Sequence, residues 1–426
     1  MRLTAARRSA AAPPGRQAGR VRTMVVLPAD PESMAIGGIA SFIRGFVKFA
    51  PPDFDISFVG VSSTRPLGHW QKVELEGREM QFMPVSRGRA ESRTHVPLAL
   101  GFVAGLIRHR RRLHLGDRVL SFHRPGTDLP FMFARARKWR VVHLSVKDLT
   151  TAGSESRWRT IPRLLAAIET RSFRRMDRIY VVNERVAADY RSRFPEVAGR
   201  IRYLPNWADP TIFAMQPEDA RATTRLAIAT ELSLPPSGPL LLFAGRLEGQ
   251  KNPRLLAETF AEVRSRRPSA YLIVAGNGSL EAALRDTLAS LRVQDATRFI
   301  GTVSRSRLAM LMNACDVQVI TSRYETGPTV GFESLACGLP IATTNVGQVA
   351  RLIEAGGAGQ VVDEHSPAAL ANAIEWIIDQ PADRLRTAAT ATAQPYLADQ
   401  VLRQIYDDSR ELARPPSAYD PELDRS

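Results

Sequence analysis

The sequence contains little cysteine and no long apolar run. Its 426 residues include two cysteines, Cys315 and Cys337, each inside an apolar segment. Two such residues are too few for a disulfide framework or a zinc site, so we expect buried, reduced thiols in a cytosolic type of chain. No segment reaches the roughly eighteen consecutive apolar residues of a membrane-spanning helix. The absence of a Gly-x-y period or a low-complexity tract excludes fibrous and largely disordered proteins.

Lysine is also scarce, since it accounts for five of the 58 basic residues. Residues 1–210 carry 37 Lys and Arg against 18 Asp and Glu, whereas residues 211–426 carry 21 against 25. This asymmetry indicates an anionic partner for the N-terminal half, although a GC-rich genome also produces excess arginine. One hypothesis is therefore a basic protein that binds an anionic polymer. We expect no nucleic acid, because no recognised motif and no interleaving of aromatic and basic residues accompanies the charge.

Residues 1–22 hold six arginines and no acidic residue. We expect a disordered basic leader, with a transit peptide as the alternative, because a secretory signal would need an apolar core. From Met24 onward, short apolar segments alternate with amphipathic ones, which predicts βαβ units and parallel, doubly wound sheets. The expected strands are 24–28, 55–61, 118–122, 140–144, 178–182, 201–204, 239–244, 270–275, 297–300, 316–320, 340–343 and 360–362. The expected helices are 37–49, 97–112, 127–137, 158–175, 184–193, 254–266, 278–290, 304–313, 330–337, 346–355, 367–379 and 395–412.

The alternation is interrupted by a proline-rich stretch near residues 209–238, which we interpret as an interdomain connection. The expected fold class is α/β, with two Rossmann-like, doubly wound parallel-sheet domains facing across a cleft. Such folds bind ligands at the carboxyl ends of their strands. The expected parts are the leader 1–22, an N-terminal domain 23–210, a connection 211–238, a C-terminal domain 239–385, and a C-terminal helix and polar tail 386–426.

Several glycine-containing turns follow expected strands. Gly37-Gly38 opens the first helix, where a backbone without side chains lets a phosphate approach the helix N-terminus. In the second half, Arg246 and Lys251 follow the first strand and could neutralise a diphosphate. The segment Gly276-Asn277-Gly278 ends the next strand in another close-approach turn. Each of these features is also compatible with an ordinary turn or a solvated loop.

The segment from Ser322 to Pro340 is the richest in functional residue types. Glu325 lies beyond a strand, a Gly-Pro loop follows, and a short helix then carries Glu333. The backbone amides of Thr329 and Val330, at the start of that helix, could hold a phosphate. Two glutamates eight residues apart are common by chance, so the spacing alone predicts nothing. The loop between them and the start of the helix are what favour a functional site here.

Together these motifs resemble the GT-B glycosyltransferases of family 4. The residues that carry the resemblance are Gly37-Gly38, Gly245-Arg246 with Lys251-Asn252, Gly276-Asn277-Gly278, and Glu325-x7-Glu333 followed by Ala336-Cys337-Gly338-Leu339-Pro340. The resemblance is dense over residues 235–365 and thinner over 24–207. It implies retaining transfer of a sugar from a nucleotide diphosphate donor to an acceptor glycan or lipid-linked glycan. It implies no cofactor and no essential metal. A nucleotide-sugar epimerase on the same fold is the alternative.

The resemblance also implies roles for individual residues. Arg246 and Lys251 correspond to the pair that holds the donor diphosphate. Glu333 corresponds to the glutamate that binds the ribose hydroxyls, and Glu325 to the one near the reacting carbon. The sequence departs from the commoner Gly-Phe-Gly pattern with Thr326-Gly327-Pro328-Thr329, which bears on the identity of the donor.

In the N-terminal half, Gly37 and Gly38 correspond to a loop that closes on the phosphates. The family's active-site histidine ends a strand there, and His143 in Val141-Val142-His143-Leu144-Ser145 matches that placement. His123 ends the preceding strand and is the rival candidate. By this resemblance the donor binds residues 239–363 and the acceptor residues 23–207.

Two further patterns have simpler interpretations. Asp53-Phe54-Asp55 is similar to a metal-binding Asp-x-Asp motif, but it precedes a strand, so we interpret it as a strand entrance. The basic run from Arg108 to Arg112 ends an apolar helix that contains Phe102, Val103, Leu106 and Ile107. These cations would offset the helix dipole, or the helix would lie on anionic lipid. The expected location is the cytoplasm, with peripheral contact at the inner face of the membrane as the further hypothesis.

Overall fold

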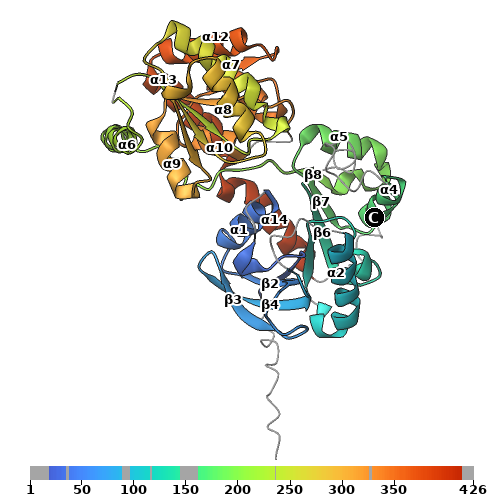
Figure 1. The fold of residues 1–426 in the computed structure, drawn as a ribbon. Helices are drawn as coiled ribbons and strands as arrows, with labels where there is room; N and C mark the ends of the chain where they lie inside the picture. Colours follow the sequence, from blue (N-terminus) through green and yellow to red (C-terminus); the bar gives the residue numbers. More distant parts are fainter. Residues whose placement is uncertain are drawn as a thin grey trace, which may run out of the picture. The chain divides into compact units, whose positions relative to one another are not determined.

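The computed structural model describes residues 19–34, 38–88, 96–115, 118–143, 162–235, 237–325 and 329–414. Contacts divide the chain into unit 1, residues 1–204 with 402–426, and unit 2, residues 205–401. Figure 1 draws most of unit 1 in blue to green and most of unit 2 in yellow to orange. Among the described residues, no helix is both long enough and apolar enough to cross a membrane.

Unit 1 is built on an eight-stranded sheet in the order β3-β4-β2-β1-β5-β6-β7-β8. The strand pairs are parallel except β3 with β4, which form an antiparallel hairpin at the edge. The strands are β1 (Val21–Val26), β2 (Phe54–Val61), β3 (Gln71–Leu75), β4 (Arg78–Ser86), β5 (Val119–Phe122), β6 (Arg137–Val142), β7 (Arg178–Val181) and β8 (Ile201–Tyr203). The helices are α1 (Gly38–Lys48), α2 (Val96–His109), α4 (Pro162–Phe173), α5 (Glu184–Arg193) and most of α14 (Ala398–Ala413).

The C-terminal helix α14 is anchored on unit 1 by buried polar contacts. The hydroxyl of Tyr406 donates to the carbonyl of Phe46 at 2.9 Å, and the hydroxyl of Tyr180 donates to Asp408 at 2.6 Å. Burial and the neighbouring Asp408 carboxylate raise the pKa of Tyr180, so this hydroxyl stays protonated. Residues far apart in the sequence thus complete one core.

Unit 2 contains a six-stranded sheet in the order β11-β10-β9-β12-β13-β14, with every pair parallel. Its strands are β9 (Leu240–Ala244), β10 (Tyr271–Ala275), β11 (Thr297–Gly301), β12 (Val317–Ile320), β13 (Ile341–Thr344) and β14 (Gly359–Val362). Its helices are α6 (Glu218–Glu231), α7 (Pro253–Arg266), α8 (Glu281–Ser290), α9 (Arg305–Ala314), α10 (Thr329–Ala336), α11 (Gly347–Gly356), α12 (Pro367–Asp379) and α13 (Ala382–Ala393).

Both faces of the unit 2 sheet are covered, as a parallel sheet requires. Leu240, Leu242 and Ala244 of β9 belong to one core cluster, and Leu241 and Phe243 belong to the other. This alternation follows from the two-residue period of a strand. It explains why β9 appears in the sequence as an unbroken apolar run.

The structure differs from the sequence-based expectations in several places. The helix expected at residues 127–137 is instead a 3₁₀ turn, Leu129–Phe131, followed by β6. Residues 211–238, expected to be a connection, contain α6, and Phe213, Ile228 and Leu234 pack in the unit 2 core. β1 begins at Val21, inside the range expected for the leader; residues 1–18 lie outside the described residues.

Candidate active site

The strand order of unit 2 places β9 next to β12 at the point where the order reverses. Counted from β9, the order is 3-2-1-4-5-6, the arrangement of a dinucleotide-binding fold. Ligands of such sheets bind outside the carboxyl ends of the strands at this reversal. Lys251 lies in the loop after β9 and Glu325 in the loop after β12. The sheet therefore brings together two residues that are 74 positions apart in the sequence.

Lys251 and Glu325 form an ion pair that is largely shielded from solvent. The ammonium of Lys251 donates to Oε1 of Glu325, and the two side chains are 17% and 7% exposed. The Ser322 hydroxyl donates to the same carboxylate oxygen at 2.7 Å. The amide of Gln250 lies 3.4 Å from the other oxygen, Oε2. These contacts hold the carboxylate in one orientation.

Backbone contacts hold the two loops to each other. The backbone N–H of Arg323 donates to the carbonyl of Gln250 at 2.8 Å, and the Thr321 hydroxyl donates to the carbonyl of Lys251 at 2.7 Å. Sequence analysis did not identify Gln250, Thr321 or Ser322 as part of the site. Their only signal was position, since each is adjacent to Lys251 or within four residues of Glu325.

The segment Gly276-Asn277-Gly278 supports the loop that carries Arg246. A Cβ on Gly276 would lie 1.9 Å from the carbonyl oxygen of Gly245, and one on Gly278 would lie 2.3 Å from that of Leu247. The Leu247 N–H donates to the carbonyl of Asn277 at 3.0 Å. Glycine is therefore required for backbone packing. The expected contact of these residues with a donor stays a prediction.

Arg246 itself is exposed, and among the described residues its guanidinium has no hydrogen-bond or ion-pair partner. The side chain is consequently available to a ligand at the end of β9. This availability is compatible with the expected role of Arg246 as a diphosphate ligand and does not test it.

Glu333 lies on α10 and is 8% exposed. Among the described residues its carboxylate has no hydrogen-bond partner, and burial raises its pKa to about 7. The guanidinium of Arg305 opposes this increase, while the carboxylate of Asp209 adds to it. A buried carboxylate without partners is suited to accept hydrogen bonds from ligand hydroxyls.

Thr329 and Val330 form the first turn of α10 and are partly buried. The amides of a first helical turn have no partner inside the helix, which agrees with the expected phosphate-binding role. Residues 326–328, the preceding part of the loop, lie outside the described residues.

In unit 1, His123 follows β5 and His143 follows β6. Nδ1 of His123 lies 3.2 Å from Nε2 of His143, and the Ser121 hydroxyl oxygen lies 2.8 Å from Nε2 of His123. Burial is the main cause that lowers the pKa of His143 to about 3, and that of His123 also falls well below its ordinary value. Both imidazoles are therefore neutral at pH 7, and one donates to the other. Sequence analysis treated them as rivals, whereas the structure joins them in one network.

Helix α1 lies against this network. Phe42 packs on His123 with ring centroids 5.1 Å apart and on His143 with centroids 5.4 Å apart. Gly38 opens the same helix one turn earlier, so it lies at the same edge of the unit 1 sheet as both histidines. Gly37 lies outside the described residues.

The Asp53-Phe54-Asp55 segment is confirmed as a strand entrance. Asp53 accepts two hydrogen bonds from Arg410, at 2.8 and 2.9 Å, and Asp55 lies 3.5 Å from Arg22. β2 begins at Phe54. Within the described part of the chain, no group of three or more His, Cys, Asp or Glu side chains is placed to hold a metal ion.

Comparison with known proteins identifies the second unit. The family model described as glycosyl transferases group 1 matches residues 225–394. Residues 225–394 are therefore similar to the group 1 glycosyl transferases. All the residues of the Lys251, Glu325 and Glu333 site lie inside this segment.

Similarity to known proteins extends beyond residues 225–394. A glycogen synthase of Mycobacterium tuberculosis is 29% identical over 284 residues, which cover 62% of this chain and 65% of that enzyme. The chain thus spans less than two thirds of this relative's length.

Cys315 and Cys337 are both free and buried, as expected from the sequence.

Solved structures show the fold of the whole chain. Sucrose-phosphate synthase of Thermosynechococcus elongatus has a TM-score of 0.73 at 18% identity, covering 92% of this chain and 99% of that one. HepE of Anabaena, solved in complex with UDP-glucose, has a TM-score of 0.63 at 15% identity, covering 91% and 98%. These likenesses confirm the expected GT-B fold with two Rossmann-like units.

The raised pKa of Glu333 predicts a specific pH dependence of stability. Because the folded pKa of about 7 exceeds the ordinary glutamate value of 4.5, this group stabilises the fold fully below pH 4.5, and the contribution is lost as pH rises through 7. We expect the free energy of unfolding of the wild type to fall by about 3 kcal/mol more than that of Glu333→Gln between pH 4.5 and 8. Urea unfolding of both proteins across this range measures the difference.

The control for this experiment is Glu354→Gln, which replaces an exposed glutamate on α11. Its unfolding free energy should follow that of the wild type at every pH. Parallel curves for the wild type and Glu333→Gln would contradict the prediction.

Proposed function

We propose that the protein is a glycosyltransferase that moves a sugar from a nucleotide diphosphate sugar to an acceptor glycan or lipid-linked glycan. The observation that carries this proposal is the Lys251–Glu325 pair at the strand reversal of the group 1 domain. The name printed for the M. tuberculosis relative and the UDP-glucose bound to HepE support a nucleotide-sugar donor.

In this proposal each donor-site residue has a distinct task. Glu333 accepts hydrogen bonds from the ribose hydroxyls, because its buried carboxylate has no partner within the described residues. Lys251 and Arg246 bind the diphosphate, together with the amides at the start of α10. They stabilise the negative charge that develops on the leaving group, which is electrostatic preorganisation. Glu325, held by Ser322, lies beside the donor sugar.

Unit 1 contributes the histidine pair. With His143 neutral, its Nδ1 has no hydrogen-bond partner among the described residues and can contact a sugar hydroxyl. Nδ1 of His123 contacts Nε2 of the His143 ring, and the Ser121 hydroxyl in turn contacts Nε2 of His123. This arrangement favours His143 as the residue that touches the substrate and His123 as a positioning residue.

Retention of configuration and independence from metal complete the proposal. Retention rests on the resemblance to family 4. Metal independence is supported by the cations at the end of β9, since Arg246 and Lys251 can supply the charge that a bound metal ion supplies in other transferases. The epimerase alternative would consume the donor without an acceptor, so product analysis with and without acceptor separates the two activities.

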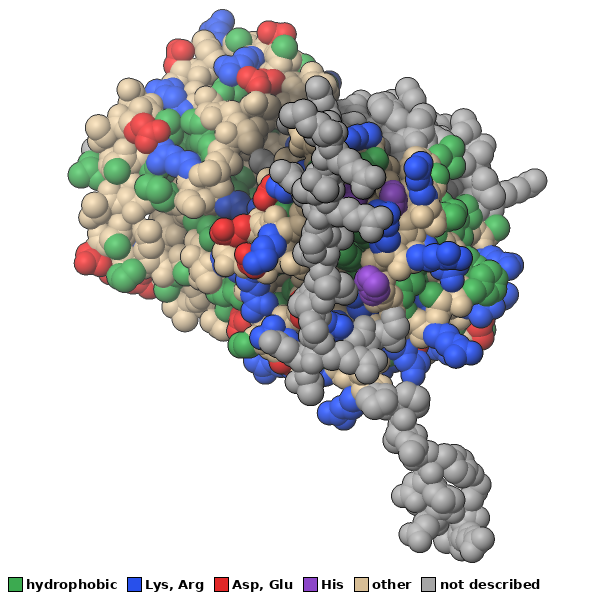
Figure 2. Space-filling model, turned by 90° about the horizontal axis from the view of Figure 1, so that it is seen from below, with side chains coloured by type: hydrophobic (Ala, Val, Ile, Leu, Met, Phe, Trp, Pro, Cys, Tyr) green, Lys and Arg blue, Asp and Glu red, His purple; other side chains and the backbone are tan. Residues whose placement is uncertain are grey.

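Peripheral membrane contact of unit 1 is the second part of the proposal, together with a cytoplasmic location. The structure corrects the apolar face expected for it, because Phe102 and Leu106 are buried in the unit 1 core. Ile107, which belongs to the expected set, is 60% exposed, and Leu100, which does not, is 66% exposed. Arg110 and Arg111 follow α2 and are exposed. Figure 2 shows Lys and Arg side chains gathered on the right of the view, the side on which Figure 1 draws α2.

The donor-site prediction begins with a screen of nucleotide sugars for thermal stabilisation, since a ligand that binds only the folded state raises its melting temperature. With the donor found, Lys251→Met and Glu325→Gln should each lose about a hundredfold or more in kcat, because each removes a preorganised charge. Their melting temperatures should stay near that of the wild type.

The matched control is Lys72→Met, which breaks an exposed lysine–glutamate pair with Glu79 in the β3–β4 hairpin. Its turnover should be unchanged. Near-normal kcat in both donor-site variants would remove this loop from the reaction centre, and stabilisation by no nucleotide sugar would argue against the whole proposal.

Chelation tests the metal-independent mechanism. We expect full activity after exhaustive dialysis against EDTA, because cations of the chain itself neutralise the leaving diphosphate. Initial rates before and after dialysis provide the measurement. Activity that disappears with the chelator and returns with manganese or magnesium would show that a metal ion is required.

Vesicle sedimentation tests the membrane contact. We expect pelleting with anionic vesicles that weakens at high salt, because cations near a surface contribute about 1 kcal/mol each and the Debye length falls from about 10 Å at 0.1 M to about 3 Å at 1 M. The double variant Arg110→Gln/Arg111→Gln should pellet less. The control is Arg384→Gln/Arg403→Gln, which removes two exposed cations from other helices. Equal, negligible pelleting with neutral and anionic vesicles at low salt would exclude the contact.

A further inference from the structure

Unit 1 contains a pocket of about 310 Å³ at the amino ends of β6, β7 and β8. It lies at the opposite edge of the sheet from the histidine pair. β6 is six residues long, so the two edges are roughly 20 Å apart. The pocket is therefore separate from the strand ends at which donor and acceptor are expected to bind.

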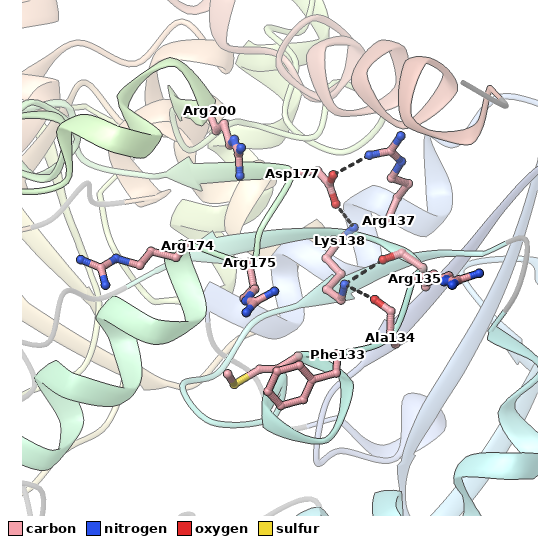
Figure 3. Close-up of a pocket in the computed structure, with 11 residues that line it drawn as sticks. Phe133, Ala134, Arg135, Arg137, Lys138, Arg174, Arg175, Asp177 and Arg200 are labelled. Carbon is pink, nitrogen blue, oxygen red and sulfur yellow. Dashed lines mark hydrogen bonds and ion pairs between the residues drawn. The ribbon is translucent and has the colours of Figure 1, made fainter. Parts of the chain in front are cut away.

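The lining of this pocket is strongly cationic. It contains six basic side chains and one carboxylate. The basic residues are Arg135, Arg137, Lys138, Arg174, Arg175 and Arg200, and the acidic residue is Asp177. Figure 3 shows Lys138 and Arg175 above the ring of Phe133, with Arg174 and Arg135 extending to the two sides.

Protein groups neutralise only part of this charge. The carboxylate of Asp177 forms an ion pair with Arg137 at 3.0 Å and accepts a hydrogen bond from the backbone N–H of Lys138 at 2.8 Å. Arg174 pairs with Glu196 at 2.8 Å, and Arg200 donates to the carbonyl of Met176 at 3.1 Å. These contacts pair two of the six cations, Arg137 and Arg174, with carboxylates and occupy one donor of a third, Arg200.

The other three cations have no carboxylate in direct contact among the described residues. Arg135 is exposed and makes no hydrogen bond or ion pair there. Arg175 stacks on Phe133, with its guanidinium carbon 5.4 Å from the ring centroid. Lys138 is 6% exposed, and its ammonium donates to the carbonyls of Ala134 and Ala136 at 2.7 and 2.9 Å. An ammonium has three donors, so one remains for a ligand.

The environment of Lys138 shows that a bound anion would be favourable. Burial lowers the pKa of this ammonium, and Arg175 and Arg137 lower it further, against the opposing carboxylates of Asp177 and Asp128. An anion in the pocket would offset the desolvation of the charge and the repulsion between the cations. The Arg175 guanidinium also lies over the ring of Phe133, which is 75% exposed, in a cation–π contact at the edge of the pocket.

We propose that this pocket is a second ligand site of unit 1, which binds the phosphate group of a small phosphomonoester. A phosphomonoester carries about 1.5 to 2 negative charges at pH 7 and three acceptor oxygens, which matches three available cations better than a carboxylate or a phosphodiester does. The volume lies at the lower end of small-ligand sites and suits a compact molecule. Free metabolites and lipid headgroups both carry such a phosphate, and the experiment below separates these two sources.

Isothermal titration calorimetry at constant ionic strength tests the proposal on the full chain. The free probes are inorganic phosphate and glycerol 3-phosphate, with sodium chloride as the reference. The lipid probe is a phosphatidylcholine vesicle that contains phosphatidic acid, compared by flotation with one that contains phosphatidylglycerol, a phosphodiester. We expect saturable binding to a monoester probe and a preference for phosphatidic acid only if the source is a headgroup.

The decisive variant is Arg135→Gln/Arg175→Gln, since both side chains are exposed and neither has an ion pair among the described residues. It should weaken monoester binding by about tenfold or more, because hydrogen bonds to charged groups contribute about 1.4 kcal/mol or more and that energy is tenfold in affinity. Arg135→Gln alone, which removes no contact in the described structure, should weaken it by a smaller factor. The matched control, Arg384→Gln/Arg403→Gln, removes the same charge from exposed positions outside the pocket and should leave the affinity unchanged.

Three results would overturn the proposal. They are no saturable binding of any monoester probe, equal affinity in the pocket variant and the wild type, or equal losses in the pocket variant and its control. Nucleotide-sugar stabilisation measured on the same samples depends on unit 2. A failure of this proposal is therefore distinguishable from a failure of the proposed transferase activity.

Discussion

The ion pair between Lys251 and Glu325 exists because β9 and β12 are neighbours in a parallel sheet. In a parallel sheet all strands deliver their following loops to the same edge, and the reversal of strand order leaves room between two of those loops. Every feature of the candidate site in unit 2 depends on this arrangement. The Gly276 and Gly278 turns pack against the loop after β9, and Ser322 and Gln250 orient the carboxylate after β12. A different strand order would keep the same motifs and destroy the site.

The same logic explains how much could be predicted from the sequence. Twelve of the fourteen strands that the structure describes, all except β3 and β4, were expected within a few residues, because buried parallel strands are short apolar runs between turn residues. Lys251 and Glu325 were selected because they follow such runs, and Glu333 because it lies on the short helix after the Gly-Pro loop. Their expected roles came from the resemblance to family 4. The side chains that orient them were not identified. Ser322 and Gln250 are ordinary polar residues, and only the fold shows that they contact Glu325.

The elements that were missed have physical explanations. The β3–β4 hairpin turns through Glu76 and Gly77, both with positive φ of 52° and 75°. Two positive φ angles define the tight turn that suits a two-residue hairpin, but glutamate is an unusual residue at such a position and gave no signal. Helix α6 was hidden by the prolines around it. The expected helix at 127–137 contains Pro130 and Ala136, and its apolar residues serve the 3₁₀ turn and the start of β6 instead.

Unit 1 separates its electrostatic environments along the strands of one sheet. At the carboxyl edge, burial keeps two histidines neutral, so they can exchange hydrogen bonds with each other and with hydroxyl groups without attracting counterions. At the amino edge, cations are concentrated where β6 and β7 begin. The positive charge of the N-terminal half is therefore not a uniform property that follows from arginine-rich composition alone. Part of it is built into the ends of core strands, where Lys138 is buried at a cost that a solvent-exposed lysine would avoid. A bias toward arginine in the composition does not explain why the ammonium of a lysine, Lys138, is buried in a pocket that other cations line.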